Sequence, residues 1–204
     1  WTAASSAARH PIRSATSSSS SPRWGTMHWP SATLISSGAR GLVSQMTGEV
    51  CAAYTLAFLQ GLNLAEPGRK IALGMDLRPS SPSIVQACAA AIKQADCEAV
   101  FCGALPTPAL AFYAMSQHMP AIMVTGSHIP FDRNGIKFYR AEGEISKADE
   151  AAITQAVVEV AGFGEDEMPA VDSGALELYK QRYTGLFERD LLTGWRIGIY
   201  EHSS

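Results

Sequence analysis

Short apolar segments alternate with longer segments of helical periodicity in the middle of this chain, and that alternation restricts the possible folds more than any other feature. The apolar segments lie at residues 70–75, 98–102 and 121–125. Between the first two, apolar residues such as Ile84 and Cys88 recur with the 3.6-residue period of a helix. This order of elements produces crossover connections and parallel pairing. The sequence therefore predicts a three-layer α/β/α domain with a mixed, mostly parallel sheet.

Shorter signals predict the helix boundaries and a fourth strand. Ser81 followed by Pro82, and Thr107 followed by Pro108, are typical of helix starts. The remaining predicted elements are a helix from Thr47 to Gly61, helices at 147–160 and 175–190, and a hairpin or edge strand at 136–139.

The two ends of the chain depart from this pattern. Residues 1–31 are rich in serine, contain arginine but no acidic residue, and show no apolar periodicity, so we expect them to be disordered. This composition fits either a transit peptide or extraneous sequence ahead of a start at Met27. Residues 32–190 form the predicted domain. Residues 191–204 are expected to be a linker and the first strand, from Trp195, of a second domain that is cut short.

Composition excludes several classes of protein. The formal net charge is −3, whereas nucleic-acid binding requires a clustered basic face. No apolar run approaches the roughly 20 residues that a membrane span needs. The four cysteines form no C-x-x-C motif, and none has a histidine at metal-ligand spacing. Reduced, buried thiols in a cytoplasmic protein are therefore expected.

The loops that follow the predicted strands carry hydroxyls, glycines and cations. In a crossover sheet these loops meet at the carboxyl edge, where ligands bind. The loop after residues 121–125 reads G-S-H-I-P-F-D-R-N-G-I-K-F-Y-R and brings Ser127 together with Arg133, Lys137 and Arg140. Cations next to glycines that permit close backbone approach favour a phosphorylated ligand.

Two other segments have the same character. The segment S-S-G-A-R-G places Arg40 ahead of the first predicted helix. The segment D-L-R-P-S-S at 76–81 places Arg78 near a helix N-terminus, which favours anions. Taken singly, Arg78 could be a solvent-exposed charge and Ser81 could be an ordinary helix N-cap. A phosphorylated ligand is favoured because these loops are expected to lie at the same edge of the sheet as the loop of Ser127.

A serine hydrolase does not fit these residues. Ser127 and His128 are neighbours in the chain, and adjacent side chains usually diverge. The second glycine of the G-x-S-x-G motif is also missing.

The loop V-T-G-S-H-I-P…N-G-I-K-F-Y resembles the active-site loop T-A-S-H-N-P…N-G-x-K of the α-D-phosphohexomutases, the phosphomannomutase and phosphoglucomutase family. Three further segments resemble family motifs in the same order. They are L-I-S-S-G-A-R-G for the opening F-G-T-S-G-x-R-G, G-M-D-L-R-P-S-S for G-R-D-x-R-x-S, and L-P-T-P-A-L for G-x-x-P-T-P. The chain is therefore identified as a member of this family, carrying its N-terminal domain.

The resemblance implies an isomerase that interconverts hexose 1-phosphate and hexose 6-phosphate, with mannose as the preferred sugar and glucose as the alternative. Ser127 would rest as a phosphoserine, donate its phosphoryl group to one sugar hydroxyl, and regain one from the resulting bisphosphate. Arg40 and Lys137 would be acid/base or electrostatic partners, and His128 would order the loop or contact phosphate. Arg133 and Arg140 are added as phosphate ligands from charge and spacing.

The sequence departs from the family pattern at several positions. Gly126 stands in place of the usual alanine, Ile129 in place of asparagine, and Met75 where an arginine is common. The family's magnesium loop, D-G-D-G-D-R, belongs to its second domain and has no counterpart here. The resemblance therefore implies Mg²⁺ held by the Ser127 phosphate and by an aspartate loop missing from this chain. With domains II to IV missing, we expect the chain alone to be inactive.

A non-catalytic domain is the alternative interpretation. Such a domain would bind a sugar phosphate or a partner protein through the same edge of the sheet, and it would not need a phosphate on Ser127.

Overall fold

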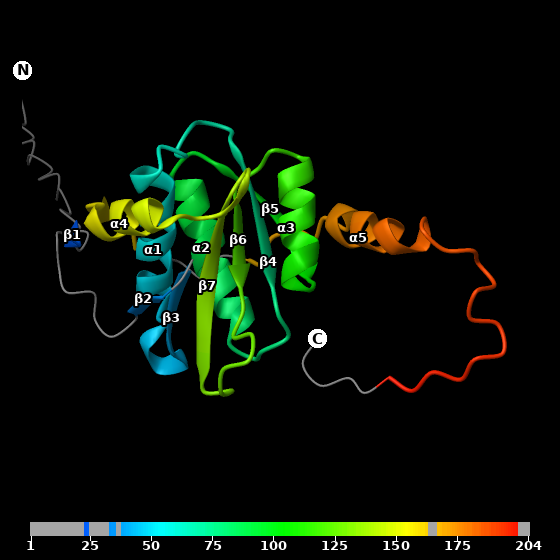
Figure 1. Cartoon of the computed structure of the whole chain (residues 1–204). Helices are drawn as coiled ribbons and strands as arrows, with labels where there is room; N and C mark the ends of the chain where they lie inside the picture. The colour runs from blue at the N-terminus through cyan, green and yellow to red at the C-terminus, as the bar shows by residue number, and fades with distance from the viewer. Residues whose placement is uncertain (1–22, 25–32, 36–37, 163–166, 200–204) are drawn as a thin grey trace, which may run out of the picture.

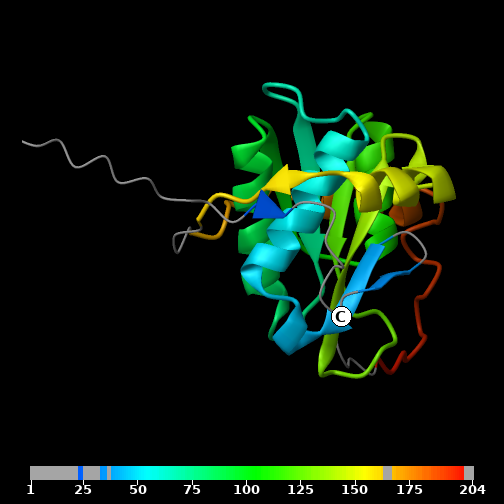
Figure 2. The ribbon, with the colours of Figure 1, turned by 90° about the vertical axis from the view of Figure 1, so that its left-hand side faces the viewer.

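The computed structural model of this chain describes residues 23–24, 33–35, 38–162 and 167–199. Its main sheet has seven strands. In spatial order they are β2 (Thr33–Ile35), β3 (Gly38–Leu42), β7 (Arg133–Arg140), β6 (Ala121–Val124), β4 (Lys70–Met75) and β5 (Glu98–Ala104), with β8 (Gly143–Glu144) beside β7. A separate ribbon pairs β1 (Arg23–Trp24) with β9 (Val158–Glu159), seen at the front of Figure 2.

Helices cover both faces of the sheet, so the predicted three-layer α/β/α architecture is confirmed (Figure 1). One face carries α1 (Gly48–Gly61), α2 (Ser81–Gln94) and α4 (Lys147–Gln155), and the other carries α3 (Thr107–Ser116) and α5 (Gly174–Thr184). Among the described residues, no helix is long and apolar enough to cross a membrane.

The sheet is mixed, as predicted, but its parallel part is smaller than expected. Parallel pairing is confined to β4 with its neighbours β5 and β6. The strands β2, β3 and β7 pair antiparallel. The sequence predicted an edge or hairpin strand at 136–139, whereas β7 is longer and lies inside the sheet, between β3 and β6.

Glycine explains how β3 pairs so closely with β7. The sequence suggested a loop ahead of the first helix at this point, but Gly38 begins a strand. A Cβ atom on Gly38 would lie 2.1 Å from the carbonyl oxygen of Ile136, and one on Gly135 would lie 2.7 Å from the carbonyl oxygen of Ala39. Only glycine fits at either position without moving backbone.

The alternation of side chains along the strands builds two cores. On β7, Ile136 and Phe138 are buried on the face covered by α1 and α2, and Phe138 stacks on Phe58 of α1 with ring centroids 4.7 Å apart. On the opposite face, Met123 and Tyr139 pack against α3. Each large apolar side chain buried in this way contributes about 1.5–3 kcal/mol to folding.

The helix starts differ in detail from the sequence prediction. Helix α2 begins at Ser81 with Ser80 at the N-cap, and no side chain caps it. The hydroxyl of Ser81 instead donates to Asp76 Oδ1 at 2.6 Å. Helices α4 and α5 are shorter than predicted, ending at Gln155 and Thr184.

The predictions for the chain ends fare differently. Arg23 and Trp24 form β1, so the expected disorder of residues 1–31 does not hold for these two residues, and the others lie outside the described ones. The predicted strand from Trp195 is not formed among the described residues. The side chains of Trp195, Ile197 and Ile199 are exposed there by 62 to 79%.

An ion pair joins the far end of β7 to the first turn of α4. The guanidinium of Arg140 donates to both carboxylate oxygens of Asp149, with Nε 3.0 Å from Oδ2. The backbone N–H and the hydroxyl of Ser146 add hydrogen bonds at 2.8 and 2.9 Å. Arg140 first, and then Ser146, hold the pKa of Asp149 well below its usual range.

We expect this carboxylate to make stability depend on pH in the acid range. Because the folded-state pKa of Asp149 is lowered, its stabilising contribution is complete above the unfolded pKa of about 3.9 and is lost as the pH falls through the folded value. The Asp149→Asn variant should therefore be less stable than the unsubstituted chain at pH 7, with the gap closing on acidification below pH ~4. Urea unfolding across pH measures this, with the exposed Asp190→Asn as control. A gap that stays constant with pH contradicts it.

Candidate functional site

The loop that carries Ser127 connects β6 to β7 at the carboxyl edge of the parallel strands, as the sequence predicted. Ser127 has a backbone φ of +50°, in the left-handed region. Its N–H donates to Thr125 Oγ1 at 2.9 Å. The serine that the sequence analysis singled out therefore has an uncommon backbone conformation fixed by a neighbouring hydroxyl.

Asp76, directly after β4, anchors the start of this loop. Its Oδ2 accepts from the N–H of Gly126 at 2.9 Å and from Thr125 Oγ1 at 3.1 Å. Its Oδ1 accepts from Ser81 Oγ and from the N–H of Arg78, the latter at 3.1 Å. This role of Asp76 was not predicted from the sequence. Its position at the end of a strand, inside a quoted motif, was the available signal.

Arg78 holds the rest of the loop. Its guanidinium donates to four backbone carbonyls, those of Ile129 at 2.6 Å, Pro130 at 2.7 Å, Arg133 at 3.0 Å and Ser127 at 3.3 Å. Its Nε lies 3.5 Å from Asp76 Oδ2. The sequence favoured phosphate at the loop 76–81, and in the structure Arg78 of this loop donates its hydrogen bonds to the backbone of the serine loop.

Asn134 is a second supporting residue that sequence reasoning missed. Its side chain is fully buried. Its Nδ2 donates to Ser80 Oγ at 2.9 Å and to Ser81 Oγ at 3.0 Å, while its Oδ1 accepts from the N–H of Gly135 at 2.8 Å. The hydroxyls of Ser80 and Ser81 thus join the start of α2 to β7 through Asn134.

A cavity of about 300 Å³ brings most of the predicted site residues together. It is lined by Ser127, His128, Arg40, Lys137, Thr107, Thr125 and the strand residues Gly38, Ala39, Gly135 and Ile136. The register of β3 and β7 places Arg40 opposite Gly135 and Lys137 opposite Gly38. Each cation therefore lies opposite a glycine, which leaves room above the sheet.

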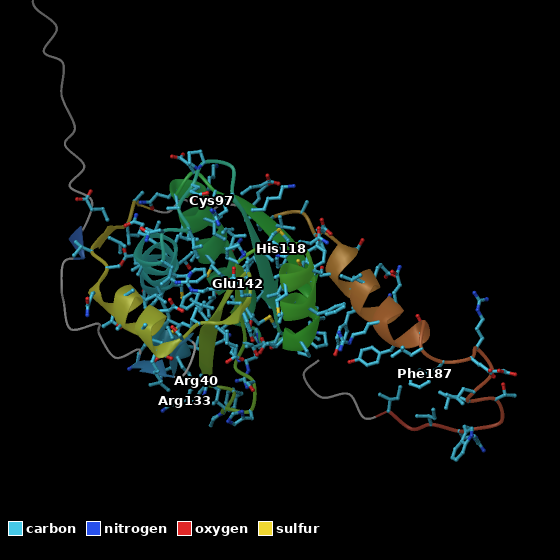
Figure 3. The ribbon with its side chains drawn as sticks, turned by 45° about the horizontal axis from the view of Figure 1, so that its top comes forward. Arg40, Cys97, His118, Arg133, Glu142 and Phe187 are labelled. Atoms are coloured by element: carbon cyan, nitrogen blue, oxygen red, sulfur yellow. The ribbon has the colours of Figure 1, made fainter. Side chains whose placement is uncertain are left out.

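Arg133 lies at the same edge of the sheet and Arg140 does not. Figure 3 shows Arg133 and Arg40 side by side, in agreement with a register that places them two positions apart across the strands. Arg140 is at the opposite end of β7 and is paired with Asp149. The structure thus does not bring Arg140 to the cavity, because an eight-residue strand is about 25 Å long.

A second cavity, of about 280 Å³, opens on the other side of Ser127. Asp76, Leu105, Thr107, Met123 and Thr125 are among its lining residues. Ser127, Thr107 and Thr125 line both cavities. The serine therefore stands at the boundary between a cationic cavity and a less charged one.

His128 contacts the serine directly. Its Nδ1 lies 3.2 Å from Ser127 Oγ, and the tautomer of the ring decides which of the two donates. The expectation that neighbouring side chains diverge therefore does not apply here. The left-handed backbone at Ser127 turns both side chains to one side of the loop.

Lys137 is held in its charged form. Burial alone would lower its pKa, but hydrogen bonds to Glu144 and Tyr139 outweigh that effect, and the pKa of Lys137 is raised above its usual value. Its ammonium also lies 5.2 Å from the centroid of the Tyr139 ring. At neutral pH this group is a cation and a proton donor, not a base.

The described residues contain no group of three or more His, Cys, Asp or Glu side chains that could hold a metal ion. Asp76, whose carboxylate accepts hydrogen bonds from the start of the serine loop, already accepts from four groups of the protein. The described part of the chain therefore does not fit a complete magnesium site by itself.

Comparison with known proteins shows which proteins this chain is similar to. Residues 33–161 match the family described as "Phosphoglucomutase/phosphomannomutase, alpha/beta/alpha domain I". A phosphomannomutase of Salmonella muenchen is 49% identical over 170 residues, which cover 82% of this chain and 35% of the relative. A phosphomannomutase of Sinorhizobium fredii is 43% identical, over 82% of this chain and 37% of the relative. The chain thus spans about a third of the length of these curated relatives.

A solved structure shows the same fold. The crystal structure of a putative phosphomannomutase from Thermus thermophilus superposes with a TM-score of 0.64 at 22% identity, over 81% of this chain and 38% of that one. At that identity the likeness concerns the arrangement of elements and not the chemistry.

Proposed function

This chain belongs to the phosphoglucomutase/phosphomannomutase family, and from that premise we propose that it carries the phosphoserine centre of a hexose phosphate mutase. The observation that carries the proposal is the position of Ser127 Oγ, at the edge of a cavity lined by Arg40, Lys137 and His128. Cations around a hydroxyl stabilise the charge of a phosphoryl group attached to it, and no triad is needed when the serine rests phosphorylated.

Each group then has a role in the transfer. In the forward step a sugar hydroxyl attacks the phosphorus and loses its proton, the P–O bond to Ser127 Oγ breaks, and the serine oxygen takes up a proton. In the return step the serine hydroxyl attacks the other phosphoryl group of the bisphosphate and loses its proton, the P–O bond to the sugar breaks, and the sugar oxygen takes up a proton. His128 Nδ1, 3.2 Å from Ser127 Oγ, is placed to exchange the serine proton. Arg40 and Lys137 supply positive charge in both steps.

Mg²⁺ would neutralise further charge in such a reaction. A phosphate oxygen on Ser127 would be this chain's contribution to its coordination. Because the described residues hold no suitable cluster of carboxylates, the remaining ligands would have to come from outside them.

The proposed substrates are hexose phosphates and the corresponding bisphosphate. Mannose is preferred over glucose in this proposal, because the two relatives at 49 and 43% identity are phosphomannomutases by name. The proposed setting is the cytoplasm, where phosphorylated sugars are handled, and the proposed partners of this domain are the further domains that mutases of this family carry.

Intact-mass measurement tests the proposal. A full-length protein that carries this chain, incubated with glucose 1,6-bisphosphate and Mg²⁺, should gain the mass of one phosphoryl group, and peptide mapping should place it on Ser127. The 204-residue chain alone should not interconvert mannose 1-phosphate and mannose 6-phosphate, since the described residues hold no group of side chains that could complete the metal site. A full-length protein that stays unphosphorylated would favour the non-catalytic sugar-phosphate-binding alternative. Interconversion by this chain would contradict its expected inactivity.

A further inference from the structure

The backbone at Ser127 is unusual even among left-handed residues of this chain. Besides Ser127, the described non-glycine residues with positive φ are Asn63, Asp96 and His118. These three follow the C-terminal ends of α1, α2 and α3, where left-handed residues commonly end helices. Ser127 ends no helix. It lies in a turn closed by the hydrogen bond from the N–H of Ile129 to the carbonyl of Gly126, and contacts from outside that turn hold it as well.

Those contacts come from both sides of the residue. On the N-terminal side, the N–H of Ser127 donates to Thr125 Oγ1, which in turn donates to Asp76 Oδ2. On the C-terminal side, the carbonyl of Ser127 accepts from Arg78 Nη2. The torsions that aim Ser127 Oγ are thus bracketed by two hydrogen bonds that both lead back to the segment after β4.

Arg78 has no N–H left for a ligand. A guanidinium has five N–H groups. Here the four on Nη1 and Nη2 are directed at the carbonyls of the serine loop, and Nε faces Asp76. The side chain of Arg78 is 12% exposed, which also keeps it away from solvent anions.

The loop is shaped to receive this guanidinium. A Cβ atom on Gly126 would lie 2.1 Å from Arg78 Nε and 2.2 Å from Cζ. An alanine at position 126, the usual residue of the loop that this one resembles, would require the guanidinium to move. The glycine therefore lets the planar group lie directly against the backbone that precedes the serine.

We propose that Arg78 is a positioning residue, whose planar guanidinium holds the Ser127 loop in the conformation that presents Ser127 Oγ to the cationic cavity, and that it does not bind phosphate. The inference rests on the proposed function for its consequence, phosphoryl uptake, but its structural half stands on the hydrogen bonds alone. The inference predicts that the planar fork of N–H donors on Arg78 is needed to hold the loop, and that a positive charge at position 78 without that fork does not hold it.

Arg78→Lys separates shape from charge, because lysine keeps the charge but offers only three donors from a single nitrogen. The matched control is Arg196→Lys, which makes the same exchange at an exposed position. Phosphoryl uptake from glucose 1,6-bisphosphate by a full-length protein that carries each variant is followed by mass spectrometry at several donor concentrations, and amide hydrogen exchange of residues 126–133 is measured in parallel. Arg78→Gln, which keeps a planar amide but no charge, serves as a second variant if the lysine variant does not fold.

The expected result is a split between rate and affinity. Arg78→Lys should lower the maximal rate of uptake at least about tenfold, leave the donor concentration for half-maximal rate unchanged, and speed exchange in the loop. Uptake at the rate of Arg196→Lys would overturn the inference. So would an unchanged maximal rate with weaker donor affinity, which would make Arg78 a phosphate ligand. No uptake by the unsubstituted full-length protein would instead overturn the proposed function, and hydrogen exchange alone would then decide whether Arg78 holds the loop.

Discussion

Replacing Ser127 with alanine should abolish phosphoryl uptake by a full-length protein that carries this chain and lower its mutase rate by at least about a thousandfold. The reason is chemical, since the proposed reaction passes through a covalent bond to Ser127 Oγ, and removal of a covalent nucleophile typically costs several orders of magnitude. The measurement is intact mass after incubation with glucose 1,6-bisphosphate, with peptide mapping of residues 121–140.

The substitution should leave the fold unchanged, which makes the result interpretable. The conformational free energy that alanine and serine need to adopt a φ of +50° is nearly the same. Among the described residues, the only hydrogen bond of the side chain that the exchange removes is the exposed one between Ser127 Oγ and His128 Nδ1. Ser116→Ala, at the far end of α3, is the matched control and should load like the unsubstituted chain. Phosphate uptake by Ser127→Ala at the control rate would mean that another residue is the acceptor.

The second large effect is expected at Asp76, on stability. The carboxylate accepts four hydrogen bonds and faces Arg78, and both side chains are largely buried, with 16 and 12% exposure. Removing one partner of a buried ion pair leaves the other charge uncompensated, at a cost of about 3–5 kcal/mol. In a chain of this size, that corresponds to a fall in Tm of roughly 6–20 °C.

Urea unfolding of Asp76→Ala, with Asp190→Ala as an exposed control, measures this cost. The variant should also lose phosphoryl uptake, because Thr125 and Gly126 lose their acceptor. A stability loss below about 1 kcal/mol would show that Asp76 contributes no more than a typical hydrogen bond.

The fold was predictable where one physical signal dominated. The strands at 70–75 and 98–102 and the helix after Pro82 combine apolar runs with clear start signals, and the structure has all three. The strand β3 was missed because its G-A-R-G sequence has neither apolar alternation nor β-branched residues. It is a strand because its glycines let it pair with β7, which is a tertiary cause that periodicity does not record.

The site residues likewise divide into those that a sequence motif revealed and those that depend on tertiary contacts. Ser127, His128, Arg40 and Lys137 were found by their motifs, and the structure gathers them around one cavity. Arg140 was selected by charge and spacing, but strand geometry carries it to the other end of β7. The roles of Asp76, Arg78 and Asn134 could not be predicted, because each depends on hydrogen bonds between segments about 50 residues apart.

The position of β7 limits how this domain can change in evolution. Ile136 and Phe138 fill the core under α1 and α2, while Gly135 and Lys137, on the alternate positions, face the cavity. Inserting or deleting a single residue inside β7 would exchange the two sets, burying an ammonium and exposing a phenyl ring in the same event. Length variation among descendants of this sequence should therefore collect in the tip of the preceding loop, where Phe131 is 91% exposed, and be absent from the strand itself.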